Sequence, residues 1–149
     1  MCGRFALTSN ESTLRERFKT NIPPTLTRRF NIAPSQKILV LRTRSHQIRR
    51  ESALLWWGLI PSWAHDQSIG AKLTNARSET ALTKPSFRDS FRQRRCLIPA
   101  DGFYEWTASK NIKQPYYIRL ASHQPFGIAG LWDSWESDGE RIETCTILT

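Results

Sequence analysis

The chain has 149 residues, 39% of them hydrophobic and 23% charged, with a formal net charge of +9 and a pI near 10.1. This length supports one domain with a real core, and the composition is that of an ordinary soluble protein. No apolar run approaches the ~18–20 residues of a membrane helix, and the N-terminus lacks the layout of a signal peptide.

Taken in order, the first half predicts a strand at residues 3–8 and a helix over about 10–19, opened by a capping box at 8–11. A loop is expected at 22–30 and a turn at 31–35. Strands follow at 37–42 and 51–60, with His46 and Gln47 at the hairpin tip between them. Pro61 then ends the second strand.

In the second half, residues 73–79 begin extended and lead into a short helix near 78–83. Another helix starts at Ser86, with Phe87 and Phe91 one turn apart. Asp101-Gly102 predicts a hairpin that joins strands at 95–99 and 103–106. Three more strands are expected at 115–120, 126–132 and 142–149. The pattern predicts an α+β fold whose mainly antiparallel sheets curl into a barrel-like core with a few short helices.

Cysteines and charge restrict the function. Three cysteines without a secretory signal indicate a reducing cytosol and free thiols. No Cys-x-x-Cys or His-x₃-His spacing occurs, so no metal site is expected. The basic excess suits a polyanion, of which nucleic acid is the commonest in a cytosol, and it equally suits a solubilising surface.

Cys2 stands directly behind the initiator methionine. Removal of Met1 would leave an α-amine and a thiol on adjacent carbons, two nucleophiles that together trap an aldehyde as a five-membered thiazolidine. The alternative is that position 2 merely tolerates a small residue.

Glu105 lies among aromatic residues in the stretch 103–106. Desolvation favours the protonated form of a carboxyl group, which suits proton transfer near neutral pH. A strand glutamate that faces water is the alternative.

Asn75 and Arg77 are two residues apart in an extended stretch, so both side chains face one side. An amide and a guanidinium together can hold a sugar hydroxyl and a phosphate, or can be a structural amide beside a surface arginine. Arg4, two residues from Cys2, could lower the pKa of that thiol or hold a phosphate. Trp63, in a break after Pro61, could stack on a base; the other tryptophans are expected in the core or on strand faces.

Together these residues resemble the SRAP family, named after SOS-response-associated peptidases. The resemblance spans residues 1–149 as a single SRAP domain. It rests on Met1-Cys2-Gly3-Arg4, Asn31-Ile32-Ala33-Pro34, the stretch from Trp57 to Trp63, the stretch from Asn75 to Thr80, the stretch from Cys96 to Trp106, and Ala129-Gly130-Leu131-Trp132.

The resemblance implies a cytoplasmic, nucleoid-associated enzyme that senses abasic sites in single-stranded DNA and needs no cofactor. It implies a covalent thiazolidine cross-link through Cys2, with Glu105 as acid and base and Asn75 orienting the opened sugar or the N-terminus. Self-processing peptidase and lyase activities are also implied. DNA-binding roles are implied for four residues: Arg4 and Arg77 on phosphates, and Pro34 and Trp63 along the groove.

Family members continue past residue 149 into a segment with a histidine that this sequence does not match. The domain is therefore expected to lack that segment, and the truncated chain to self-associate. Two other functions stay open: a cysteine-dependent peptidase, which needs a base for Cys2, and a non-catalytic single-stranded DNA-binding module.

Overall fold

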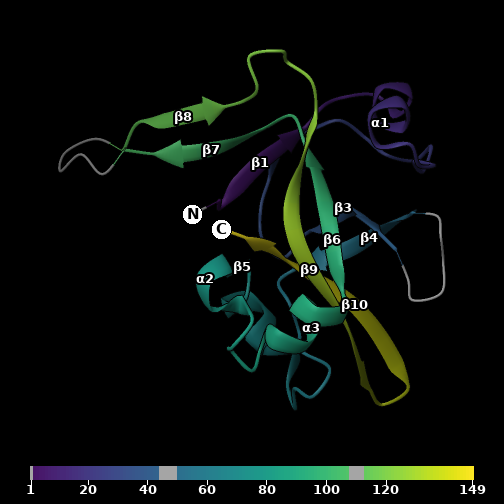
Figure 1. Ribbon diagram of the computed structural model, residues 1–149, viewed down its shortest axis with the longest axis vertical. Helices are drawn as coiled ribbons and strands as arrows, with labels where there is room; N and C mark the ends of the chain where they lie inside the picture. Colours follow the sequence, from purple (N-terminus) through teal and green to yellow (C-terminus); the bar gives the residue numbers. More distant parts are fainter. Residues whose placement is uncertain (1, 44–49, 108–112) are drawn as a thin grey trace.

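The central strands of the molecule close on themselves. In a computed structural model, which describes residues 2–43, 50–107 and 113–149, five strands form a closed barrel (Figure 1). They are β3 (Lys37–Arg42), β4 (Glu51–Trp57), β6 (Arg95–Ala100), β9 (Phe126–Ser137) and β10 (Glu140–Leu148). Neighbours run antiparallel except where β10 meets β4, and this parallel pairing closes the barrel. The predicted α+β fold with a barrel-like core is confirmed.

A second, antiparallel sheet contains the N-terminal strand. Its order is β2 (Arg29–Ile32), β1 (Arg4–Leu7), β7 (Gly102–Trp106) and β8 (Pro115–Ile118). Phe5 from β1 contacts Trp57 from the barrel, with ring centroids 5.4 Å apart in an edge arrangement. Both side chains are fully buried in the main hydrophobic cluster, so the two sheets share one core.

Helices cover two opposite parts of the barrel (Figure 1). α1 (Glu11–Phe18) buries Leu14 and Phe18 on one face, as their spacing predicts. Its N-cap is Asn10, whose side chain accepts a hydrogen bond from the Thr13 amide, and the capping box expected from residue 8 is wrong.

The other helices lie at the far end of the barrel and cover a second buried cluster. They are the 3₁₀ helix η1 (Gln67–Lys72), α2 (Ser78–Ala81) and α3 (Arg88–Gln93). Phe87 and Leu131 lie in this cluster, with Phe91 packed against it. The short strand β5 (Asn75–Ala76) runs parallel to the end of β10 and connects this layer to the barrel.

The hairpin predicted at Asp101-Gly102 is wrong. β6 and β7 belong to different sheets, because the chain turns a corner at Asp101. The Asp101 carboxylate accepts hydrogen bonds from the Thr8 and Ser9 amides, and its own amide donates to Ala6. A Cβ at Gly102 would lie 2.4 Å from the end of the Tyr117 ring, so a larger residue there would displace this exposed side chain.

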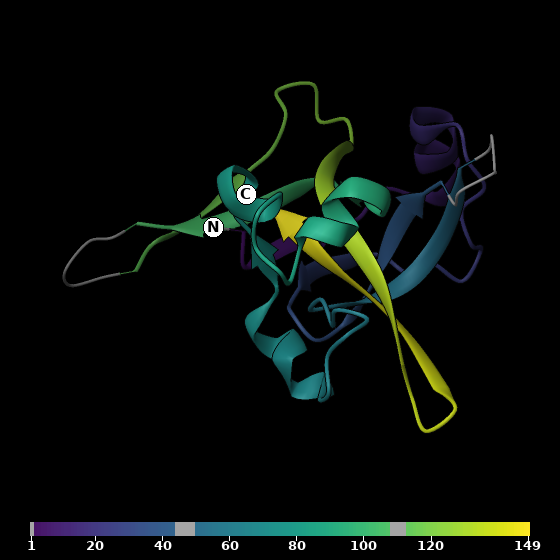
Figure 2. The ribbon, with the colours of Figure 1, turned by 60° about the horizontal axis from the view of Figure 1, so that its bottom comes forward.

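A different Asp-Gly pair makes the hairpin. Asp138 and Gly139 have φ of 53° and 81°, as a type I′ turn requires, and they join β9 to β10. This hairpin projects from the barrel (Figure 2). β9 is consequently longer than the predicted strand at 126–132.

Three smaller predictions also change. The strand expected at 51–60 ends at Trp57, because Gly58 has a φ of 142°. The loop and turn expected at 22–35 contain the strand β2. The hairpin tip at His46 and Gln47 lies outside the described residues. Within the described ranges, no helix is long and apolar enough to cross a membrane.

Candidate active site

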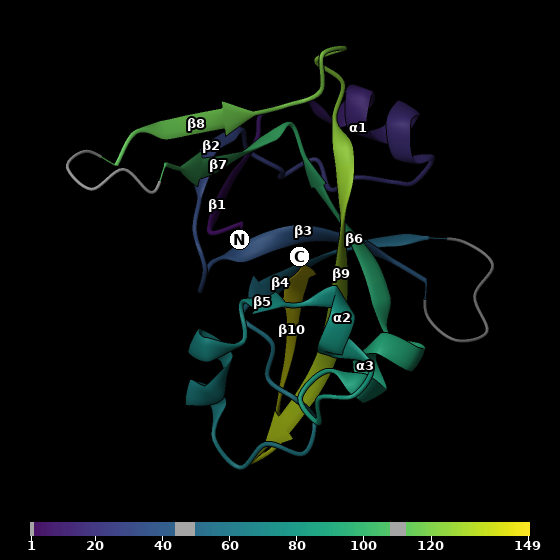
Figure 3. The same ribbon diagram turned by 60° about the vertical axis from the view of Figure 1, so that its left-hand side comes forward.

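The beginning of β1 and the end of β10 lie side by side (Figure 3). Cys2 and Thr149 line a single cavity of about 300 Å³. Hydrogen bonds connect the end of β10 to β5, from the Thr149 amide to Ala76 and from the Ser78 amide to Thr149. Residues from opposite ends of the chain therefore form one site.

Cys2 is almost completely buried, at 7% exposure. Its Sγ donates to the Arg4 carbonyl at 3.8 Å. Burial raises the pKa of the Cys2 thiol to about 11, and the negative charge of Glu105 adds to that rise. The thiol is therefore protonated at neutral pH.

Glu105 lines the same cavity, on β7. Alternation along that strand turns Phe103 and Glu105 toward the cavity and their neighbours to the other face. The structure thus brings together the two residues that the sequence proposed as nucleophile and proton-transfer group, at a cavity that is otherwise mostly apolar.

Asn75 lies beside this cavity, since its register partner on β10 is Ile147, a lining residue. Its Nδ2 atom is 3.4 Å from the Thr74 hydroxyl. Its Oδ1 atom is buried and accepts no hydrogen bond among the described residues. A buried acceptor without a donor is costly, so the atom calls for a partner beyond those that the described residues supply.

Arg4 lies on the other face of the N-terminal sheet. Its guanidinium donates to Asn31 at 3.0 Å and lines a separate groove with Tyr104 and Trp106. The strand begins only at Arg4, so Cys2 does not share its face. The pKa of the Cys2 thiol is raised, which leaves phosphate binding as the remaining expectation for Arg4.

Arg77 is exposed at the start of α2, two residues from Asn75. No ion pair to its side chain occurs within the described residues, so the guanidinium is available to an anion. Ala76 between them is fully buried, consistent with a shared outward side for Asn75 and Arg77.

Pro34 and Trp63 lie on separate turns, both distant from Cys2 in the sequence. Neither residue lines the Cys2 cavity. Pro34 lies in the turn between β2 and β3. Trp63 is 50% exposed on a turn held by β9: the Ser62 amide donates to Asp133, and the Trp135 indole donates to the Ala64 carbonyl. The turn is therefore fixed while its tryptophan stays accessible.

Sequence reasoning missed most of the cavity wall. Phe103, Phe126, Ile128, Ile147, Leu148 and Thr149 line it alongside the two predicted residues. The alternation of Phe126 and Ile128 in the sequence indicated that both side chains share one face of a strand. It did not indicate that this face borders a cavity. In the described part of the chain, no group of three or more potential ligands could hold a metal ion.

The family model of the SOS response associated peptidase (SRAP) matches residues 1–149. The chain belongs to the SRAP family. This confirms the resemblance recognised from its sequence motifs.

Named relatives of this SRAP protein include abasic site processing proteins. YoqW from Bacillus subtilis (strain 168) is 44% identical over 156 residues, which cover 100% of this chain and 68% of the relative. YedK from Escherichia coli (strain K12) is 32% identical over an alignment that covers 100% of this chain and 67% of YedK. A crystal structure of a Bacteroides thetaiotaomicron protein superposes with a TM-score of 0.87 at 27% identity, covering 99% of this chain and 67% of that one.

Proposed function

We propose that this protein captures abasic sites in single-stranded DNA by a covalent thiazolidine bond to Cys2, after removal of Met1. The observation that carries the proposal is the shared cavity of Cys2 and Glu105. The relatives named as abasic site processing proteins support the same substrate class. An opened abasic sugar presents an aldehyde at C1′, which is the group that an amine and a thiol on adjacent carbons trap.

The reaction begins at the amine, because burial keeps the Cys2 thiol protonated. The unprotonated α-amine, with a reference pKa of about 7.7–8.0, adds to C1′ and gives a carbinolamine. Loss of its hydroxyl group as water leaves a protonated imine. The sulfur then gives up its proton and bonds to C1′, while the nitrogen keeps the proton that it already carries, which closes the ring. One water is released overall.

Glu105 performs the two proton transfers. Its carboxylate takes the proton that the α-ammonium group loses when the free amine forms and passes it to the departing hydroxyl group of the carbinolamine. The carboxylate thus regenerated then accepts the thiol proton before ring closure. Its position beside Cys2 suits both steps, and its negative charge already acts on the thiol.

Asn75 and the arginines orient the strand. The unpartnered Oδ1 atom of Asn75 accepts a hydrogen bond from the α-amine or a sugar hydroxyl. Arg77 and Arg4 hold phosphates of the flanking nucleotides, and Trp63 and Pro34 line the groove. The surplus charge of +9 supplies the general affinity for DNA.

A peptidase function has less support. A cysteine protease needs a thiolate held by a neighbouring base, whereas the pKa of Cys2 is raised to about 11. Neither His65 nor His123, the histidines of the described residues, lines the cavity.

The test is adduct formation with a single-stranded oligonucleotide that carries one abasic site. Wild type is expected to give a heat-stable species whose mass is that of the protein without Met1 plus the oligonucleotide minus one water. Cys2→Ala should lose the adduct and keep reversible binding, because charge supplies the affinity. Cys96→Ala is the matched control, since it removes another buried thiol. A heat-stable adduct with Cys2→Ala would contradict the proposal.

A further inference from the structure

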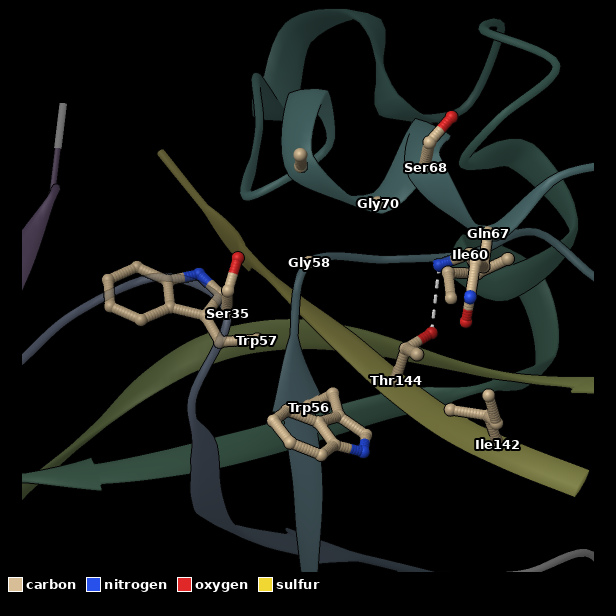
Figure 4. Close-up of a pocket in the computed structure, with 11 residues that line it drawn as sticks. Ser35, Trp56, Trp57, Gly58, Ile60, Gln67, Ser68, Gly70, Ile142 and Thr144 are labelled. Carbon is tan, nitrogen blue, oxygen red and sulfur yellow. Dashed lines mark hydrogen bonds between the residues drawn. The ribbon is translucent and has the colours of Figure 1, made fainter.

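A second cavity lies on the outside of the barrel, between β4, β10 and η1 (Figure 4). Its volume is about 370 Å³, within the range of small-ligand sites. We call it the Trp56 cavity. Its lining includes Ser35, Trp56, Gly58, Gln67, Gly70 and Thr144. None of these residues takes part in the chemistry at Cys2.

The floor of the Trp56 cavity is fixed by two glycines. A Cβ on Gly58 would lie 2.6 Å from the Gly70 carbonyl oxygen, and a Cβ on Gly70 would lie 2.9 Å from that of Gly58. The Ile60 amide also donates to the Thr144 hydroxyl at 2.8 Å (Figure 4). The backbone of β4 and the helix η1 thus meet directly, and the hollow is preformed.

One wall of the cavity is an accessible aromatic ring. Trp56 is 43% exposed, whereas the next residue, Trp57, is fully buried. The Lys37 ammonium lies over the Trp56 ring, 5.3 Å from its centre, in a cation–π contact that covers one face of the indole. A base can stack only on the opposite face, where the ammonium adds positive charge near an anion.

The polar groups at the rim have unused hydrogen-bonding capacity. Neither the Ser35 hydroxyl nor the Gln67 amide makes a side-chain hydrogen bond within the described residues, and both belong to the lining. An amide that offers a donor and an acceptor side by side matches the edge of a nucleobase, which offers the same pair.

The cavity also lies within reach of the abasic-site chemistry. Thr144 lines the Trp56 cavity and Leu148, four residues later on the same face of β10, lines the Cys2 cavity. Four strand residues span about 13 Å. That is roughly four nucleotide steps at the ~3.4 Å rise of a stacked strand. Ser35 directly follows Pro34, and Ile60 precedes the turn that carries Trp63.

We propose that the Trp56 cavity receives one nucleobase of the same DNA strand, within about four nucleotides of the abasic site. The base stacks on Trp56, its edge meets Gln67 and Ser35, and Lys37 binds a neighbouring phosphate. This inference rests on the proposed function, which supplies the single-stranded DNA. The cavity then gives that DNA a second binding point besides Cys2. Since stacking tolerates every base, the site fixes the register of the strand without reading its sequence.

The experiment measures reversible binding of oligonucleotides that carry a reduced abasic site, which has no aldehyde. In each oligonucleotide one further base is deleted, at successive positions on both sides. For wild type, deletion at one position within about four nucleotides should weaken binding roughly 5- to 150-fold, the range for loss of one stacked base. In Trp56→Ala the same deletion should hardly change the binding affinity. In Trp56→Phe, which keeps an aromatic ring, the deletion should again weaken binding by most of the wild-type factor.

Leu54→Ala is the matched control. Leu54 lies two residues before Trp56 on the same face of β4, is exposed to a similar extent, and does not line the cavity. Melting curves of all variants verify folding, which is expected to be intact because these side chains are exposed. Gln67→Ala serves as a second variant, and it should weaken binding only to oligonucleotides that keep the critical base.

The inference would be overturned if base deletion weakened binding equally at every position in both wild type and Trp56→Ala. A critical base more than about four nucleotides from the abasic site would also overturn it. The outcome is independent of the chemistry at Cys2. A protein that shows the expected deletion profile but forms no adduct with aldehyde-bearing DNA would refute the proposed function and leave the base site standing. A protein that forms the adduct but shows no position-dependent effect of base deletion would refute the base site and leave the proposed function standing.

Discussion

At the scale of single residues, the site combines a nucleophile and a carboxyl group in mostly apolar surroundings. Cys2 is buried to 7% exposure, and this burial raises the pKa of its thiol to about 11. A protonated thiol resists oxidation and premature reaction, but it must lose its proton before it can close a ring. A nearby proton acceptor is therefore required, and Glu105 lines the same cavity.

Glu105→Gln should slow adduct formation by about 10²–10⁴-fold, the typical contribution of a general acid–base group. Single-turnover adduct formation, followed across pH, measures the effect. In the variant, the rate should rise with pH more steeply than in wild type, because free hydroxide must then deprotonate the thiol. An unchanged rate and pH profile would assign Glu105 a purely structural role.

Arg77→Ala should weaken binding to damaged and intact single strands alike. It should also reduce the slope of log affinity against log salt by about 0.7, the share of one phosphate contact on a single strand. Arg141→Ala is the matched control, because this exposed arginine lies on the β9–β10 hairpin, near Glu136 and Glu143. A loss restricted to abasic DNA would place Arg77 on the opened sugar instead.

At the scale of elements, the site depends on the corner between β6 and β7. Asp101 holds this corner through the amides of Thr8 and Ser9, which follow β1. The same corner sets which face of β7 carries Glu105 into the cavity. A one-residue shift of β7 against β1 would turn Glu105 to the opposite face and leave the thiol without its partner.

Asp101→Ala should destabilise the protein by about 2–4 kcal/mol, since it removes charge-assisted hydrogen bonds and leaves partly buried amides without an acceptor. Urea denaturation provides the free energy of unfolding. Asp89→Ala, which removes an exposed carboxylate 3.7 Å from Arg88, should change it by less than about 0.5 kcal/mol. Equal effects of the two substitutions would show that the corner is not held by this carboxylate.

At the scale of the whole molecule, β8 forms one edge of the N-terminal sheet and every residue in it is exposed. Tyr116 and Ile118 are 54% and 43% exposed. An edge strand with unpaired backbone groups and apolar side chains is a template for another chain. This edge is a surface for self-association other than the chain end at which the sequence analysis expected it.

We expect the 149-residue chain to associate at high concentration, with a mean mass by light scattering that falls when Ile118 is replaced by Lys. A lysine on an edge strand opposes pairing through charge repulsion and desolvation. Leu82→Lys controls for the added charge, because Leu82 is similarly exposed (47%) but lies just after α2. A monodisperse monomer at every concentration would contradict the prediction.

Local chemistry and local pattern were sufficient for a large part of this protein. The amine and thiol of Cys2 depend only on bonded neighbours, and the spacing of Leu14 and Phe18 or the alternation in β3 reports directly on a helix face or a strand. Local pattern also singled out Glu105, Asn75 and Arg77, and the family motifs added their implied roles. The α+β barrel followed from the number and order of such segments.

Only the tertiary structure decided what depends on distant partners. The two Asp-Gly pairs have the same local sequence signal, yet only Asp138-Gly139 forms a hairpin turn. Asp101 forms a corner instead, because its carboxylate accepts hydrogen bonds from the amides of residues 8 and 9. Adjacent tryptophans likewise diverge: closure of β4 onto β10 buries Trp57 and leaves Trp56 open over a cavity. Barrel closure is a long-range pairing of segments some ninety residues apart (Trp56 with Thr144), and local sequence carries no direct signal for it.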